Sequence, residues 1–178
     1  ETKSIVIQCS RKQNKVRKII MNKEKFLSDA KANYVENPTM AMVYDIHCGK
    51  YFVAYNGYFG MVFDKADNVE NLFGNGGCNS TFMSNLFSNN TVFSSGKILL
   101  NPYKKVNHEG IALQVLEYMP DESYYNVYVQ KEFLEYFSKD VEFYSSASSL
   151  DKINISGVFV VENGEIVGYI MPVNVDRR

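Results

Sequence analysis

Hydrophobic and polar residues alternate along this chain in short runs typical of β-strands, and two segments of helical spacing interrupt these runs. Strands are predicted at residues 4–9, 16–21, 40–46, 51–54, 58–63, 97–100, 111–118, 125–129, 141–144, 153–161 and 166–173. Helical spacing of apolar residues predicts helices over residues 23–33 and 131–138. We therefore expect an α+β protein with a large share of antiparallel sheet.

Both predicted helices begin with a similar sequence. MNKEKFL at residues 21–27 recurs as VQKEFL at residues 129–134, and each copy is followed by further strands. This repeat predicts one domain over residues 1–178, made of two βαβββ half-units at residues 16–63 and 124–175. We expect their helices to lie on one face of an antiparallel sheet, with residues 64–122 as a long insertion between the halves.

Turn signals separate the strands. Asn56-Gly57 and Asn163-Gly164 each stand between apolar runs and predict tight hairpins, because both positions of a type I′ turn need positive φ. The insertion has strand-like runs on both sides of Glu109-Gly110, which predicts a hairpin of its own. Residues 74–96 are rich in Asn, Ser and Gly and predict a long loop.

Large apolar side chains interrupt this polar loop, and they include Phe82, Phe87 and Phe93. Two interpretations remain open. The loop packs on its own domain through these side chains, or it presents them to a partner.

The charge of the chain is nearly balanced, with 19 basic and 20 acidic residues among 178 and a formal net charge of -1. This balance argues against a surface devoted entirely to nucleic acid. One cluster is strongly basic and consists of Arg11, Lys12, Lys15, Arg17 and Lys18. It indicates either a contact for phosphate or an acidic partner, or a solvated hairpin tip.

Nothing in the pattern indicates membrane insertion, a metal or a cofactor. The chain has no apolar run of about 18 residues and no signal-peptide pattern, so we expect a soluble, cytoplasmic protein. Cys9, Cys48 and Cys78 are odd in number and widely spaced, which favours reduced thiols over disulfides or a zinc site. We expect no cofactor.

Candidate catalytic residues are few. His47 and His108 stand beside no nucleophile motif, and the glycine-rich residues 74–77 are not followed by the Lys-Ser or Lys-Thr of a phosphate loop. Asp64, Asp67 and Glu70 fit a solvated edge better than a metal site. The sequence predicts a protein that is not an enzyme and has no catalytic residues.

Three short motifs resemble the bacterial sliding-clamp domain, which is a DNA polymerase processivity factor. They are FVAYNGY at residues 52–58, KEFL at residues 131–134 and GYIMPV at residues 168–173. The likeness covers residues 16–63 and 124–175 and implies a clamp-like fold. The predicted helices carry both signs of charge, so DNA threaded along them would gain little from counterion release.

These observations lead to a hypothesis of a non-enzymatic binding protein from a phage or mobile element. The leading form is an anti-CRISPR-type inhibitor that binds a Cas9-like nuclease and impedes its DNA targeting. Its contact residues would be Arg11, Lys12, Lys15, Arg17, Lys18, Phe82, Phe87 and Phe93. The alternative is a clamp-like replication or recombination accessory that binds duplex DNA or a polymerase. A third form is a homo-oligomer assembled through its sheet edges.

Overall fold

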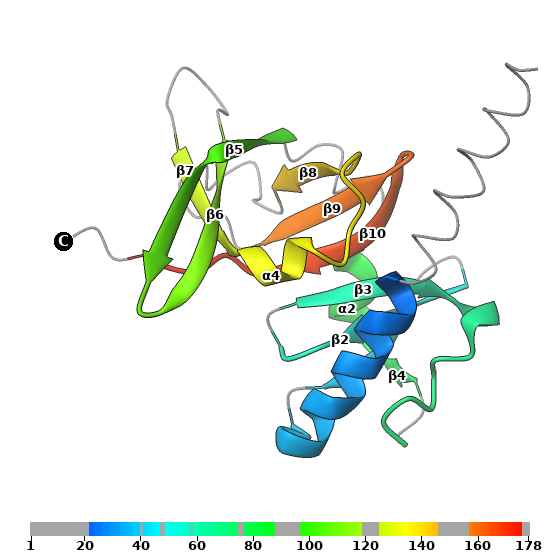
Figure 1. Cartoon of the computed structure of the whole chain (residues 1–178). Helices are drawn as coiled ribbons and strands as arrows, with labels where there is room; N and C mark the ends of the chain where they lie inside the picture. The colour runs from blue at the N-terminus through cyan, green and yellow to red at the C-terminus, as the bar shows by residue number, and fades with distance from the viewer. Residues whose placement is uncertain are drawn as a thin grey trace, which may run out of the picture.

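The computed structural model describes residues 22–39, 41–46, 49–57, 59–74, 77–87, 97–118, 125–145 and 157–175. Within these residues the chain is mixed α+β and mostly antiparallel sheet, as the pattern predicted (Figure 1). The strands are β1 (Met42–Ile46), β2 (Lys50–Ala54), β3 (Phe59–Asp64), β4 (Cys78–Asn79), β5 (Lys97–His108), β6 (Ile111–Tyr118), β7 (Tyr125–Gln130), β8 (Glu142–Ser145), β9 (Val158–Glu162) and β10 (Glu165–Ile170).

The described residues contain fewer helical elements than strands. One helix includes residues 22–36, and it extends further than the predicted residues 23–33. The others are the 3-10 turn η1 (Lys65–Asp67), α2 (Thr81–Leu86) and α4 (Lys131–Leu134). α4 ends four residues earlier than predicted, and turns and bends follow it.

The described strands form one sheet in the order β4-β1-β2-β3-β10-β9-β8-β5-β6-β7. All neighbours are antiparallel except β1 and β4, which pair in parallel over two residues. Part of the insertion therefore belongs to the sheet. Its hairpin of β5 and β6 joins β8 to β7, so residues of the insertion continue the sheet of the second half.

The predicted repeat is visible in the order of elements. The 22–36 helix is followed by the antiparallel strands β1, β2 and β3, and α4 is followed by β8, β9 and β10. The last strands of the two units pair with each other, Gly168 with Met61 and Ile170 with Phe59. β7 leads directly into α4, whereas the strand predicted before the first helix lies outside the described residues.

An aromatic core on one face of the sheet joins the two units. Phe26 of the first helix lies 5.5 Å from Phe59 and 5.5 Å from Tyr136, measured between ring centroids. Phe59 stacks on Phe133 of α4 at 4.5 Å. These rings are buried, because the apolar faces of both helices converge on the line where β3 meets β10.

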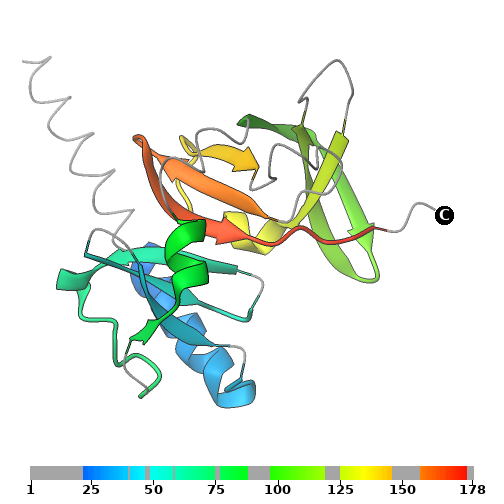
Figure 2. The same cartoon turned by 180° about the vertical axis from the view of Figure 1, so that it is seen from behind.

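The opposite face of the same strands has its own core. Phe52 and Val62 point away from the aromatic core and pack with Phe87, the residue that follows α2. Figures 1 and 2 show the 22–36 helix and α2 on opposite sides of the sheet. The prediction of helices on one face holds for the two helices of the repeat. It is wrong for α2, which forms in the segment predicted as a loop.

The predicted turns differ in outcome. Asn163 and Gly164 have φ of 52° and 80° and form the expected tight hairpin. Glu109 and Gly110 do the same with φ of 52° and 85°. At Asn56-Gly57 the prediction of two positive φ angles is wrong, because only Gly57 has one. A hydrogen bond of 2.7 Å from the amide of Tyr55 to the carbonyl of Phe59 closes a wider turn there.

Candidate binding surfaces

The residues predicted to contact a partner fall into two groups. Phe82 and Phe87 lie on and beside α2 and are described by the structure. The other predicted contacts, Arg11, Lys12, Lys15, Arg17, Lys18 and Phe93, lie outside the described residues. The described candidate surfaces are therefore those of α2, of the two repeat helices (residues 22–36 and α4) and of the sheet edges.

α2 is fixed to the sheet by Phe87. Ser80 starts the helix, because its Oγ accepts a hydrogen bond of 3.2 Å from the amide of Met83. The Phe87 side chain is only 5% exposed, and its ring centroid lies 4.7 Å from that of Phe52 and 5.8 Å from that of Phe159. The prediction of Phe87 as a partner contact is therefore wrong, since the side chain belongs to the core.

Phe82 lies on the outer side of the same helix and is 72% exposed. Met83, Leu86 and Phe87 pack toward the sheet, and this leaves Phe82 directed away from it. The loop thus packs on its own domain through Phe87, which is buried against the sheet. Phe82 is exposed on the outer side of α2 and is available to a partner. The spacing of residues 83, 86 and 87 behind a serine cap was the signal that could have predicted α2.

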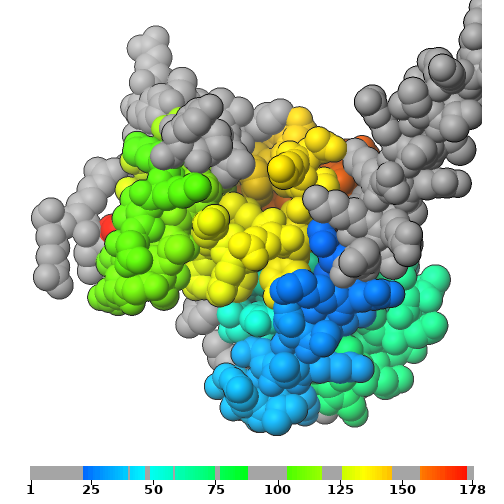
Figure 3. All heavy atoms as spheres, viewed as in Figure 1, coloured from blue at the N-terminus to red at the C-terminus, as the bar shows by residue number. Residues whose placement is uncertain are grey.

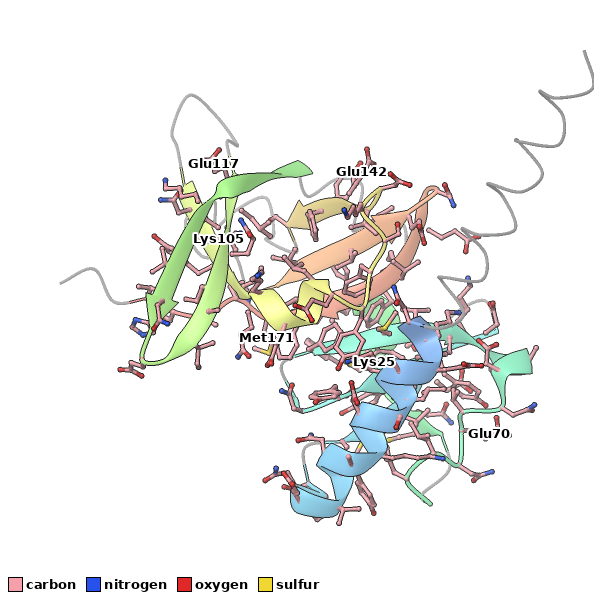
Figure 4. All side chains as sticks on the ribbon, viewed as in Figure 1. Lys25, Glu70, Lys105, Glu117, Glu142 and Met171 are labelled. Atoms are coloured by element: carbon pink, nitrogen blue, oxygen red, sulfur yellow. The ribbon has the colours of Figure 1, made fainter. Side chains whose placement is uncertain are left out.

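On the other face of the sheet, the 22–36 helix and the segment that follows α4 are joined by a polar contact. The hydroxyl of Tyr136 donates a hydrogen bond of 2.6 Å to Oδ2 of Asp29, which also accepts one of 2.7 Å from Lys25 Nζ. The same Nζ lies 4.6 Å from the centroid of the Tyr136 ring. In Figure 4 Lys25 is seen on the helix beside α4, and Figure 3 shows the two segments in contact.

This contact shifts the protonation of its members. The hydrogen bond from Lys25, and then the one from Tyr136, lower the pKa of Asp29 below its usual range. Burial, and then the bond to the Asp29 carboxylate, raise the pKa of Tyr136 far above its usual value. Asp29 is thus a stable anion that binds groups of both units, and the contact is a tie between them.

The charges on the repeat helices are balanced. Residues 22–36 include three lysines and three acidic residues, and residues 131–140 include two lysines and three acidic residues. Two of the first helix's lysines are paired, Lys25 with Asp29 at 2.7 Å and Lys23 with Asp67 at 3.6 Å. This face therefore presents no surplus of positive charge for a phosphate backbone.

Two of the acidic residues weighed as a metal site, Asp64 and Asp67, have structural roles. Oδ2 of Asp67 accepts a hydrogen bond of 3.0 Å from the amide of Asp64, which caps η1. Asp64 also lies 3.5 Å from Lys50 Nζ. Among the described residues no group of three potential metal ligands comes together. Cys78 is an exposed free thiol on β4, and His47, Cys9 and Cys48 lie outside the described residues.

Searches of protein-family models, curated proteins and solved structures found no match to this chain. In the part of the chain that the structure describes, no helix combines the length and the apolar character needed to cross a membrane. The function therefore has to be argued from the sheet, its two faces and its edges.

Proposed function

We propose that this protein is a non-enzymatic binding protein of clamp-like build, and that it works as an accessory of DNA replication or recombination. The pairing of β3 with β10 carries the proposal, because it joins two units of one helix and three strands into a single sheet. Both repeat helices pack on the same face of this sheet. This supports two clamp-like βαβββ half-units with residues 64–122 inserted between them.

The charges of the helices favour a protein as the main partner. A duplex held along the 22–36 helix would meet ion-paired lysines and as many carboxylates as amines. A polymerase or another replication protein needs no such surplus of positive charge. We assign contact with duplex DNA to the basic cluster at residues 11–18.

A second candidate function is inhibition of a Cas9-like nuclease in the manner of an anti-CRISPR protein. Phe82 favours it, because an aromatic side chain exposed at the surface of an inserted helix is a typical anchor for a protein interface. Its contact surface would combine Phe82 with Phe93 and the basic cluster. Both candidates place the protein in a bacterial cytoplasm, as the product of a phage or other mobile element.

The two candidates are separated by one binding experiment with two activity measurements. The full chain is immobilised and offered a bacterial DNA polymerase complex or a guide-loaded Cas9, each with duplex DNA as competitor. Retention of the polymerase, with longer products in primer extension, supports the accessory. Retention of the nuclease, with loss of target cleavage, supports the inhibitor. Retention of neither overturns both.

Matched variants locate the surface. Phe82→Ala is compared with Val35→Ala, because Val35 is 82% exposed and lies at the far end of the first helix. If α2 forms the interface, only the first variant weakens retention, by about 1 kcal/mol or more as for an interface anchor. Replacement of Arg11, Lys12, Lys15, Arg17 and Lys18 by Ala tests the basic cluster, and DNA binding through it should fall steeply with salt.

A further inference from the structure

At each end of the described sheet a short segment covers a longer strand. At one edge, β4 covers β1 over two residues. At the other edge, the chain leaves β10 at Ile170 and residues 171–175 return to β7, which we call the C-terminal strap. The amide of Val173 donates a hydrogen bond of 2.7 Å to the carbonyl of Tyr128 in β7. Figure 2 shows this segment passing β6 and β7.

This bond shows which way the edge of β7 points. The Tyr128 carbonyl faces away from β6, since it accepts from the strap. In an antiparallel strand the amide and the carbonyl of one residue point to the same side, so the Tyr128 amide faces outward as well. Among the described residues, this bond is the one backbone hydrogen bond from the strap to β7.

The sequence of β7 is suited to pairing with itself. It reads YNVYVQ, six residues with no charge, no Pro and no Gly, and is rich in β-branched and aromatic residues. Such segments pair readily when an edge is open. In an antiparallel pair of two copies centred on Tyr128, the outward amide and carbonyl of each Tyr128 meet those of the other. Asn126 then lies opposite Gln130, and no like charges oppose each other.

Within the part of the chain that the structure describes, one backbone hydrogen bond joins the strap to β7. The strap contains Pro172, which has no amide proton and cannot extend a ladder of hydrogen bonds. Met171, labelled in Figure 4, is 38% exposed, and Asn174 is exposed as well. A segment held by one described backbone bond and by half-buried side chains opens at low cost.

We propose that the C-terminal strap is an autoinhibitory cover, and that its release lets two copies of this chain associate through antiparallel pairing of their β7 strands. The strap shields the outward groups of Tyr128 while it is closed. When it opens, the second copy supplies the amide and carbonyl that the strap supplied in part. This inference does not depend on the proposed function.

Two variants of the full chain distinguish the hydrogen bond of the Val173 amide from the contacts of the Val173 side chain. Val173→Pro removes the amide donor, whereas Val173→Ala keeps it. Sedimentation velocity over a range of concentrations should show tighter self-association for Val173→Pro than for the parent, by about fivefold or more if one net hydrogen bond is lost from the closed state. Val173→Ala should behave much more like the parent. Equal association of the two variants overturns the proposal.

A third variant identifies the surface. Tyr128→Lys in the Val173→Pro background places two ammonium groups opposite each other in the proposed pair, so association should be lost. Association that persists shows another interface and overturns the proposal.

Hydrogen exchange on the parent gives a test that does not need the variants to fold. The Val173 amide should exchange by local opening while amides between β6 and β7 stay protected, and exchange of Val173 only with global unfolding contradicts a releasable strap.

Discussion

At the scale of single residues, the most informative contact is the one between Asp29 and Tyr136. It joins residues 107 positions apart in the sequence and ties the first helix to the segment that follows α4. Lys25 completes it with an ion pair to Asp29 and a position over the Tyr136 ring. The helical spacing that predicted a helix over residues 131–138 concerns apolar side chains, so it gave no sign of this polar contact.

Removal of the Tyr136 hydroxyl tests the tie. Tyr136→Phe should lower the free energy of unfolding by about 1 kcal/mol, because it removes a hydrogen bond to a carboxylate that Lys25 still neutralises. The measurement is urea unfolding followed by circular dichroism. Tyr34→Phe is the control, since that ring stacks on Phe73 at 5.0 Å and should change stability by less than about 0.5 kcal/mol. Equal losses in the two variants would contradict a special role for Tyr136.

Asp29 also predicts a dependence of stability on pH. Its pKa is lower in the folded chain than in the unfolded chain, so its contribution is complete above the unfolded value of about 3.9 and is lost as the pH falls through the folded value. The difference in stability between the parent and Asp29→Asn should be constant above about pH 5 and shrink below about pH 4. Urea unfolding from pH 3 to pH 7 measures this. A difference that grows toward acid would reverse the assigned shift.

At the scale of elements, the line where β3 meets β10 depends on small residues. A Cβ on Gly168 would clash with Cζ of Phe137, and one on Gly60 would clash with Cζ of Phe52. The two glycines face aromatic rings on opposite faces of the sheet, which lets both cores approach the strands closely. The packing of Phe137, which follows α4, and of Phe52, which contacts Phe87 beside α2, thus depends on the same pair of strands.

Gly168→Ala should destabilise the protein by about 1–3 kcal/mol, the usual range for overpacking in a core. The same substitution in a Phe137→Leu background should cost less, because leucine lacks the two ring atoms nearest to the added Cβ. A double-mutant cycle from chemical unfolding measures this coupling. If the cost of Gly168→Ala is the same in both backgrounds, contact with Phe137 is not its cause.

At the scale of the whole molecule, the two repeat units share one sheet and one aromatic core. β3 pairs with β10, and Phe59 of the first unit stacks on Phe133 of the second. The insertion adds to this continuity, since β5 and β6 pair with strands of the second half.

We therefore expect the two units to unfold together. The chain contains no Trp, so one can be placed in each unit as a probe. Tyr34→Trp in the first helix and Tyr144→Trp in β8 should report the same midpoint in guanidinium as circular dichroism does for each variant. Two separate midpoints would show that the repeat units are independent domains.

Features that depend on neighbouring residues along the chain follow from the amino-acid sequence. Alternation of apolar and polar residues predicted most of the described strands, and Asn163-Gly164 predicted a hairpin through its positive φ angles. Helical spacing predicted the two repeat helices, although it extended the second one four residues too far. These follow local rules of side-chain period and backbone sterics. The repeat of helix and strands could be read from the same signals.

Which strands pair and which side chains are buried depends on how the whole chain packs. The pairing of β3 with β10, the burial of Phe87 beside an exposed Phe82, the tie from Asp29 to Tyr136 and the strap on β7 all join distant residues. A period of two or of 3.6 residues tells which face of an element is apolar. It does not tell which other surface in the molecule will cover that face, because that choice depends on the packing of the whole chain.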